Sequence, residues 1–263
     1  MPGMIVDCHT HIFADEIAPK AMEALHAAYR AEPVALPTVA GVLAHMAQSG
    51  VDRAVICPVA TKPAQVTPIN DWLLSLHEPR LIPFGAIHPH CDDAAAELDR
   101  LERAGVQGLK LQPFFQQFVL DDPQVAVLFE LIADRFLVLM HAGDEIFPLP
   151  EIQPTPERLA RLLDRFPKLR MIAAHAGGYK LWDEVERDLV GRNLLFDISY
   201  TTERAPVEQL RRIVLSHGPD KVLFGSDFPW QSQTMALAGL KALGLSPDQE
   251  RAILGDNFLR AIA

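Results

Sequence analysis

Cysteine is scarce in this sequence, and its spacing supports neither cross-links nor a metal site. Cys8, Cys57 and Cys91 are the only cysteines among 263 residues, and no Cys-x-x-Cys pair occurs. An odd number of scattered cysteines argues against a disulfide framework, and the missing paired spacing excludes a structural zinc site made of thiolates. We expect all three to be small buried or half-buried side chains.

Long apolar runs, basic runs and a targeting signal are also missing. No stretch approaches the roughly 18 apolar residues of a membrane-spanning helix, and the start of the chain lacks the pattern of a signal peptide. The 24 Lys and Arg against 34 Asp and Glu give a net charge of −10, without a basic run. We therefore expect a cytoplasmic protein that acts on a small molecule and has no nucleic-acid or membrane partner.

No low-complexity linker divides the chain. The 21 Pro and 15 Gly are scattered at turns, and 49% hydrophobic content is enough for a large core. An α/β barrel commonly uses roughly 250 residues as one domain. We expect residues 1–263 to form a single domain.

Eight short apolar runs recur roughly 30 residues apart, as the strands of an alternating β/α chain would. Several are apolar on both faces, which is typical of parallel strands covered by helices. Helix start signals lie between them, such as Asp93 before one segment and Pro123 and Pro156 in the first turns of two others. The pattern predicts an α/β protein with the (β/α)8 TIM barrel fold. The runs are Ile5–Ile12, Val51–Val59, Leu81–Pro89, Val106–Phe114, Phe136–Gly143, Leu169–Gly177, Leu194–Tyr200 and Val222–Pro229.

Two regions depart from the simple repeat. The interval of about 40 residues after the first run leaves room for an additional helix or a lid, and the tail from Pro247 to Ala263 has helical spacing. An open doubly wound sheet is the alternative fold, but it would show a Gly-rich phosphate turn after the first strand. This chain has His-x-His there instead.

Histidine and aspartate recur where the apolar runs end. His9 and His11 in IVDCHTHIF are two residues apart, so on a strand both imidazoles point to the same side. His141 in FLVLMHAGD, His175 in MIAAHAGGY and Asp227 in VLFGSDFPW stand at the ends of three later runs. The carboxyl ends of barrel strands meet at one mouth, so the five side chains predict a site for a divalent metal such as zinc.

The chemistry of such a site follows from its ligands. Neutral imidazoles and one carboxylate keep a net positive charge, which lowers the pKa of a coordinated water toward roughly 7. Asp227 can bind the metal with one oxygen and accept a proton with the other, and His175 can act as a second acid or base. Asp7 shares the strand face of the two neighbouring histidines and could orient one of them; a polar core role is the alternative.

Lys110 in GLKLQPF alternates with leucines, so its ammonium and the amide of Gln112 would point into the barrel near its mouth. An unpaired buried ammonium is costly, so it needs a carboxylate, a substrate anion or a modification. Among the aromatic residues near strand ends, Tyr200 and Trp230 are our candidates for an apolar wall around the substrate. Packing is the alternative role for both.

The motifs DCHTHIF, GLKLQPF, LMHAG, AAHAGG, FGSDFPW and GDNFLRAI resemble the amidohydrolase superfamily, over essentially the whole chain. They look like the amidohydrolase-related branch that includes aminocarboxymuconate-semialdehyde decarboxylase. The resemblance implies that His9, His11, His141 and Asp227 hold one divalent metal, usually zinc, and that His175 lies beside the metal-bound water. A homodimer would also suit this family.

Two further positions can be compared with the superfamily. In its binuclear members a lysine on the fourth strand is carboxylated and bridges two metals. Lys110 matches that pattern only in part, and we prefer a salt bridge or a contact with a substrate carboxylate. Asn257 in GDNFLRAI resembles the terminal Asn-x-x-Arg pattern, which implies a structural anchor.

Two reactions compete for this scaffold. We expect a metal-dependent hydrolase of a small amide, lactone or ester, because decarboxylases of the family that the sequence resembles usually bind the substrate carboxylate with an arginine, and its counterpart cannot be identified here. Non-oxidative decarboxylation of an unsaturated or aromatic acid is the alternative. The TatD-type nucleases also begin with His-x-His, but they place glutamates where this chain has Lys110 and Ser226. A closed structural metal site in a binding protein is disfavoured because the ligands lie at an open barrel mouth.

Overall fold

The computed structural model describes residues 3–29, 32–146, 151 and 154–263. Short parallel strands in this part of the chain are followed by helices, as the alternating pattern predicts. The strands are β1 (Val6–Thr10), β2 (Arg53–Ile56), β3 (Leu81–Pro83), β4 (Gly85–Ala86), β5 (Gly108–Leu111), β6 (Leu137–Met140), β7 (Arg170–Ala173), β8 (Leu195–Asp197) and β9 (Val222–Leu223).

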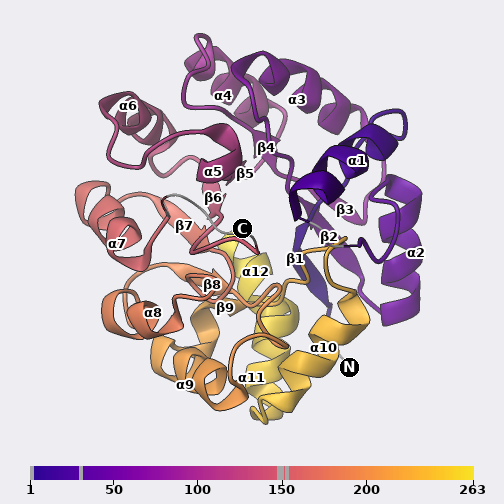
Figure 1. The fold of residues 1–263 in the computed structure, drawn as a ribbon, viewed down its shortest axis with the longest axis vertical. Helices are drawn as coiled ribbons and strands as arrows, with labels where there is room; N and C mark the ends of the chain where they lie inside the picture. Colours follow the sequence, from indigo (N-terminus) through magenta and orange to yellow (C-terminus); the bar gives the residue numbers. More distant parts are fainter. Residues whose placement is uncertain (1–2, 30–31, 147–150, 152–153) are drawn as a thin grey trace.

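The helices form a ring around the strands when the molecule is viewed down its shortest axis (Figure 1). None of the described helices is long and apolar enough to cross a membrane. The helices are α1 (Ala18–Tyr29), α2 (Val39–Ser49), α3 (Val66–Ser75), α4 (Ala94–Arg103), α5 (Pro113–Gln116), α6 (Pro123–Ile132), α7 (Pro156–Arg165), α8 (Trp182–Asp188), α9 (Val207–His217), α10 (Gln233–Ala242), α11 (Pro247–Arg251) and α12 (Asn257–Ala261), with a π-helical turn at Ala252–Asp256.

Backbone hydrogen bonds close the strands into a barrel. Strands β1 to β3 pair in one sheet and β4 to β9 in another, and Phe84 N bridges the two by donating to Ile56 O. On the other side, Cys8 N donates to Phe224 O across the seam between the first and last strands. The predicted (β/α)8 barrel is therefore confirmed. The run expected at Leu81–Pro89 forms one of the eight strand positions of the barrel, and it is divided into the two short strands β3 and β4.

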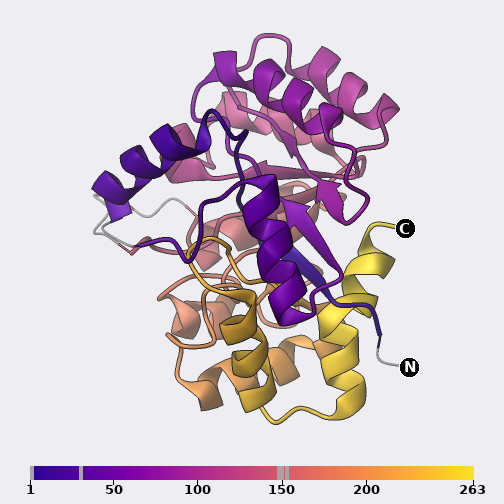
Figure 2. The same ribbon diagram turned by 90° about the vertical axis from the view of Figure 1, so that its right-hand side faces the viewer.

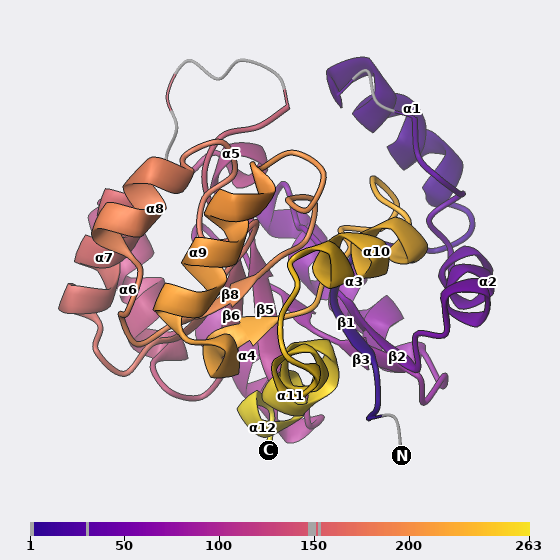
Figure 3. The same cartoon turned by 90° about the horizontal axis from the view of Figure 1, so that it is seen from below.

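The apolar core consists of two clusters, one inside the barrel and one in the layer between the strands and the helices. The larger cluster lies between strands and helices, and the smaller one fills the barrel. Phe258 of α12 belongs to the smaller cluster and lies 6.2 Å, between ring centroids, from Phe84. Figure 3 shows α11 and α12 at the end of the barrel that also carries the amino terminus, opposite α5. The helical tail thus closes the barrel at the end away from the histidines.

The local signals act as expected at most helix starts. Pro123 and Pro156 each open a helix behind a capping side chain, Asp122 and Thr155 respectively. The interval after β1 contains α1 before α2, so the additional helix is present. Figures 2 and 3 show α1 projecting beside the end of the barrel that carries α5.

Asn257 serves as the structural anchor expected from its motif. Its Nδ2 donates to Pro219 O and Val222 O, both at 2.7 Å, and its Oδ1 accepts from Arg260. These bonds tie α12 to the start of β9, so the tail that closes the barrel is held by a buried amide as well as by apolar packing.

Replacing Phe258 by alanine should destabilise the fold without removing the site at the other end. The ring is 1% exposed, and truncation of a buried phenylalanine costs about 3 to 5 kcal/mol. Urea unfolding would measure this, with Val207→Ala as the control because Val207 is 41% exposed. A loss of stability no larger than that of the control would contradict the assigned role of α12.

Candidate metal centre

A bulge in β1 places His9 at the barrel mouth. Asp7 pairs with Ala54 and Thr10 with Ile56, so β1 contains one more residue than β2 between these pairs. Nε2 of His9 lies 3.1 Å from Nε2 of His11. The two imidazoles therefore meet, as the His-x-His spacing predicts.

Asp7 does not contact either imidazole. Its carboxylate accepts hydrogen bonds from Ser226 Oγ at 2.6 Å and from Gln233 Nε2 at 2.9 Å. Burial raises the pKa of Asp7 to about 6, against the lowering effect of these donors. The hypothesis that Asp7 orients a histidine ring is wrong, because the bulge after Asp7 interrupts the strand alternation on which it relied.

Asp227 reaches the two histidines from the far end of the chain. Its Oδ1 lies 3.2 Å from Nε2 of His11 and 3.5 Å from Nε2 of His9. These three residues offer ligand atoms that all lie within 4.8 Å of one another. A single divalent cation can be contacted by groups at this spacing, so the set fits the predicted metal.

Strained backbone accompanies this convergence. The φ angles of Asp227, His175 and Tyr200 are 66°, 59° and 56°. Left-handed conformations in residues other than glycine cost about 1 to 3 kcal/mol and persist where surrounding contacts impose them. All three residues follow barrel strands, so the strain is concentrated at the mouth.

The four imidazoles are each held by an acceptor on one ring nitrogen. Nδ1 of His9 lies 3.0 Å from Asp197 Oδ2, and Nδ1 of His11 lies 2.7 Å from Cys57 O. The corresponding contacts are 3.2 Å from His141 Nε2 to Asp144 O and 3.0 Å from His175 Nδ1 to Ser199 O. Because oxygen acceptors need a donor, we assign the ring proton to this nitrogen in each case.

The remaining ring nitrogens therefore carry lone pairs at the mouth. Burial lowers the pKa of His9 and of His141 well below the usual value, with the ammonium of Lys110 adding to the effect. Burial alone would raise the pKa of Asp227, but the neighbouring imidazoles, His11 foremost, bring it below its usual value. Unprotonated nitrogens and a carboxylate at these distances form a donor set suited to a cation.

His141 joins the cluster through His175. Nδ1 of His141 lies 3.2 Å from Nε2 of His175, and the ring of His175 lies 5.3 Å, between centroids, from that of His9. The residues whose ligand atoms all lie within 4.8 Å of one another are His9, His11 and Asp227. His141 lies next to this group, on the far side of His175. The roles of His141 as a ligand and of His175 as a catalytic group remain predictions.

Asp197 is a residue that sequence reasoning missed. Asp197, His9 and His175 form a second set of residues whose ligand atoms all lie within 4.8 Å of one another. Ser199 Oγ occupies the space between these groups, since it lies 3.0 Å from His9 Nδ1 and 3.1 Å from His175 Nδ1 and donates to Asp197. We therefore interpret Asp197 as the acceptor that orients His9. Its position inside the seventh apolar run, as the last residue of β8, was the available signal.

Lys110 lies inside the site. It is 1% exposed, and its Nζ lies 3.1 Å from Nε2 of His9. Burial lowers the pKa of Lys110, although several nearby acidic groups oppose the shift. No carboxylate within the described part of the chain forms an ion pair with this ammonium. The salt bridge considered for Lys110 is therefore not observed there, and a substrate anion or a modification remains as its partner.

Glu145 is a second residue that the sequence did not reveal. It is 3% exposed, accepts a hydrogen bond from Gln112 Nε2 at 2.6 Å, and lies 3.3 Å from Nε2 of His141. Burial raises the pKa of Glu145 to about 7. Because Glu145 follows β6 within a loop, strand alternation could not place it at the mouth.

The predicted wall residues differ in their surroundings. Tyr200 is 8% exposed, and Cζ of Arg204 lies 3.4 Å above its ring centroid. The ring centroid of Tyr179 is 5.8 Å from that of Tyr200, and the charge of Arg204 opposes the rise that burial causes in the pKa of Tyr179. The Trp230 side chain is partly buried against the core beneath the helices, and the backbone N–H of Trp230 donates to Asp227 O at 2.8 Å. Contact of Tyr200 or Trp230 with substrate stays a prediction.

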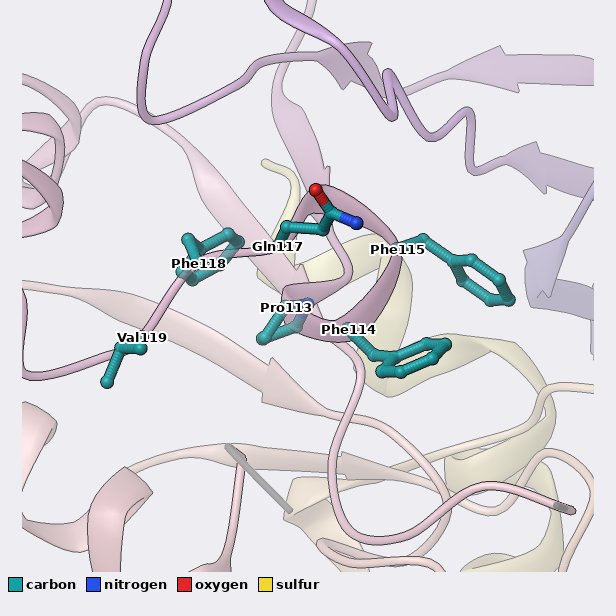
Figure 4. A pocket seen from close by; sticks show the side chains of 6 residues that line it. All are labelled: Pro113, Phe114, Phe115, Gln117, Phe118 and Val119. Atoms are coloured by element: carbon teal, nitrogen blue, oxygen red, sulfur yellow. The ribbon is translucent and has the colours of Figure 1, made fainter. Parts of the chain in front are cut away.

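Two hollows on the described surface lie apart from the histidine cluster. One of about 310 Å³ is formed by α5 and the following turn, from Pro113 to Val119. Figure 4 shows the rings of Phe114 and Phe115 on one side of this helix and Phe118 and Val119 on the other. A second hollow of about 400 Å³ lies over the amino ends of β6 to β8. Neither includes a predicted ligand, so the site is defined by its donor groups.

Comparison with protein families gives one match over nearly the whole chain. The family model described as amidohydrolase matches residues 6–261. A comparison with curated proteins gives no match.

Solved structures with the same fold include several decarboxylases. The 5-carboxyvanillate decarboxylase of Sphingomonas paucimobilis is 18% identical, with 98% of each chain covered and a TM-score of 0.77. The 2,6-dihydroxybenzoate decarboxylase of Rhizobium is 17% identical over 99% of this chain and 98% of that chain, with a TM-score of 0.72. A dihydroxybenzoic acid decarboxylase of a Polaromonas species, solved with manganese and 2-nitroresorcinol, is 17% identical over 99% and 97%, with a TM-score of 0.76. At this identity the likeness shows a shared fold.

The purified protein should contain about one equivalent of a divalent metal, and His9→Ala or Asp227→Ala should remove it, because each change deletes a ligand from a set with few alternatives. Elemental analysis measures this, with His77→Ala as a control because His77 lies away from the mouth. Two equivalents would instead indicate a binuclear site bridged by Lys110. Full metal content in a His9→Ala, His11→Ala double variant would refute the assignment.

Proposed function

The chain belongs to the amidohydrolase family, and on that basis we propose that it is a metal-dependent decarboxylase of an unsaturated or aromatic acid. The observation that carries the proposal is the buried ammonium of Lys110, 3.1 Å from Nε2 of His9 and without an ion pair in the described residues. A buried cation of this kind is stabilised by an anionic substrate.

The charges at the mouth support an anionic substrate. A divalent cation held by His9, His11 and Asp227, with His141 beside them, would add to the charge of Lys110. Asp227 and Asp197 offset only part of this total, and Glu145, with a pKa of about 7, adds little negative charge below neutral pH. A carboxylate would therefore enter a site of net positive potential. An uncharged ester or lactone gains nothing from the lysine.

Arg204 supplies a second cation near the rim. Hydrolysis was our preference from the sequence because no arginine for a substrate carboxylate could be identified there. The guanidinium lies over the ring of Tyr200, and its positive charge opposes the rise that burial causes in the pKa values of Tyr179 and Tyr200. We propose that Lys110 and Arg204 bind acidic groups of the substrate, while Tyr200 and Trp230 contact its apolar part. The activities of the structurally similar decarboxylases support this order of preference.

The metal would supply a fixed positive charge that binds oxygen atoms of the substrate and stabilises negative charge as it develops. In the decarboxylation, the bond between the carboxyl carbon and its neighbour breaks, carbon dioxide leaves, and the electron pair stays on the neighbouring carbon. That carbon must receive a proton. His175 is the proposed donor: its Nε2, which faces the cluster, takes up a proton from solvent and then delivers it, while Nδ1 is held by Ser199 O at 3.0 Å.

The proposed function also requires a choice of metal ion. The sequence resemblance implies zinc, whereas the structure of the Polaromonas enzyme contains manganese. Three nitrogen donors and one carboxylate suit zinc, and imidazole also binds other first-row divalent ions. We propose a single divalent ion, zinc or manganese, and reconstitution of the metal-free protein with each would show which restores turnover.

Isotopic labelling separates decarboxylation from hydrolysis. With an ortho-hydroxylated benzoate or an unsaturated diacid in deuterium oxide, we expect carbon dioxide release and one deuterium on the carbon that carried the carboxyl group. Aryl esters and lactones in oxygen-18 water form the comparison, because hydrolysis places solvent oxygen in the product. Mass spectrometry measures both. Turnover of esters with label in a new carboxyl group, and none of the acids, would establish the hydrolase instead.

His175→Ala should keep the metal and lose turnover by about 10² to 10⁴ in kcat, the range for removal of a positioned acid or base. The expectation rests on the other ligands, which leave little room for a fifth protein donor. Metal content and kcat should be measured on the same preparation, with the exposed rim histidine variant His90→Ala as a control. Metal loss from the folded His175→Ala protein would make His175 a ligand and favour the binuclear site.

A further inference from the structure

Asp7 is a buried carboxylate that the proposed reaction does not use. It is 0% exposed, and no cation within the described chain forms an ion pair with it. Four neutral donors satisfy it instead. Oδ1 accepts from the backbone N–H of His9 at 3.2 Å and of Ser226 at 2.9 Å, and Oδ2 accepts from Ser226 Oγ and Gln233 Nε2. Such a group is expensive to bury, so its place in the fold needs a reason.

The donors to Asp7 come from both sides of the barrel seam. His9 belongs to β1, whereas Ser226 precedes Asp227 after the last strand. The same seam has direct backbone bonds, with Asp227 N donating to His9 O at 2.9 Å and Cys8 N to Phe224 O at 2.9 Å. Gly225 permits the close approach, since a Cβ there would lie 3.2 Å from Cβ of His9. Asp7 thus links the backbone of His9 to that of Ser226, the residue before Asp227, although the two segments are far apart in sequence.

Ser226 extends this link around Asp227. Its hydroxyl donates to Asp7 Oδ2 at 2.6 Å and accepts from Phe228 N at 3.0 Å. The two neighbours of Asp227 are therefore both connected to Asp7, one directly and one through the hydroxyl. Asp227 itself has a φ of 66°, a conformation that surrounding contacts must impose on a residue with a side chain.

We propose that Asp7 is a positioning residue that sets the distance between His9 and Asp227 and holds Asp227 in its left-handed conformation. The metal affinity and the coordination geometry of the site then depend on a carboxylate that touches neither the metal nor a ligand side chain. Groups that orient ligands typically contribute 10- to 100-fold in metal affinity. The inference rests on the proposed metal centre and is independent of the reaction that the centre catalyses.

A purely structural role for Asp7 is the competing explanation. Its bond to Gln233 leads away from the site, because Gln233 Oε1 accepts from Ser49 Oγ at 3.1 Å and so ties α10 to α2. This arm of the network provides a matched control. Gln233→Leu removes a donor from the same carboxylate oxygen as Ser226→Ala does, but on the side of the helices.

The experiment compares Asp7→Asn, Ser226→Ala and Gln233→Leu in the full-length chain. Three measurements are made on each protein: the dissociation constant for Mn²⁺ or Zn²⁺ by competition with a chromophoric chelator, the visible absorption of the Co²⁺ form, and the melting temperature of the metal-free form. We expect Asp7→Asn to raise the dissociation constant about 10- to 100-fold, and Ser226→Ala to raise it less. Both should change the Co²⁺ spectrum. Gln233→Leu should lower the melting temperature and leave the other two measurements unchanged.

A double-mutant cycle tests the route through Ser226. If Asp7 acts on Asp227 by way of this hydroxyl, the loss of metal affinity in the Asp7→Asn, Ser226→Ala double variant should be smaller than the product of the two single losses. Independent effects would overturn that route.

Two outcomes would overturn the positioning role. One is wild-type metal affinity and an unchanged Co²⁺ spectrum in Asp7→Asn with a lowered melting temperature. The other is a loss of affinity in Gln233→Leu equal to that in Ser226→Ala. If Asp7→Asn does not fold, the comparison of Ser226→Ala with Gln233→Leu decides the question alone. Absence of metal binding by the wild-type protein would instead refute the metal centre.

Discussion

The closure of the barrel between its first and last strands is the constraint on which the site depends. His9 and Asp227 lie near opposite ends of the sequence, yet Asp227 N donates to His9 O across this seam. The closed eight-stranded barrel brings the two segments together, and the bulge in β1 then turns His9 toward the mouth. Apolar packing inside the barrel and the tail helix α12 stabilise the closure from the other end. Disturbing the seam would therefore separate proposed ligands that lie on strands with intact local structure.

The same arrangement concentrates groups that repel or strain one another. Unprotonated imidazole nitrogens face a carboxylate at 3.2 to 3.5 Å, and a buried ammonium lies against one of the rings. Left-handed backbone at Asp227, His175 and Tyr200 adds conformational cost. A stable protein tolerates such a cluster because the surrounding core is large, and a bound cation would compensate the facing lone pairs. The arrangement that forms the proposed metal centre therefore lowers the stability of the fold at the barrel mouth.

The strand ends could be predicted from sequence because each apolar run has a fixed direction in a barrel. That logic placed His9, His11, His175 and Asp227 at one mouth, and the structure brings them there. It could not reveal Glu145, which lies in a loop, since loop paths depend on tertiary contacts such as its bond to Gln112. It was wrong for Asp7 because a bulge depends on pairing with the neighbouring strand and leaves no mark in a single sequence. Arg204 was missed for the same reason as Glu145.

Two cations near the metal centre bear on the choice of reaction, and the sequence placed only one of them, Lys110. A ligand set of histidines and one aspartate suits either hydrolysis or decarboxylation, because both use a cation to stabilise negative charge on the substrate. What differs is the charge of the molecule admitted to the site. Lys110 lies on β5 and Arg204 in the turn after β8, and both favour acids over neutral esters, whatever the metal. Under the proposed function, substrate preference is set by cations around the metal centre, and these can change while the ligands and the barrel stay the same.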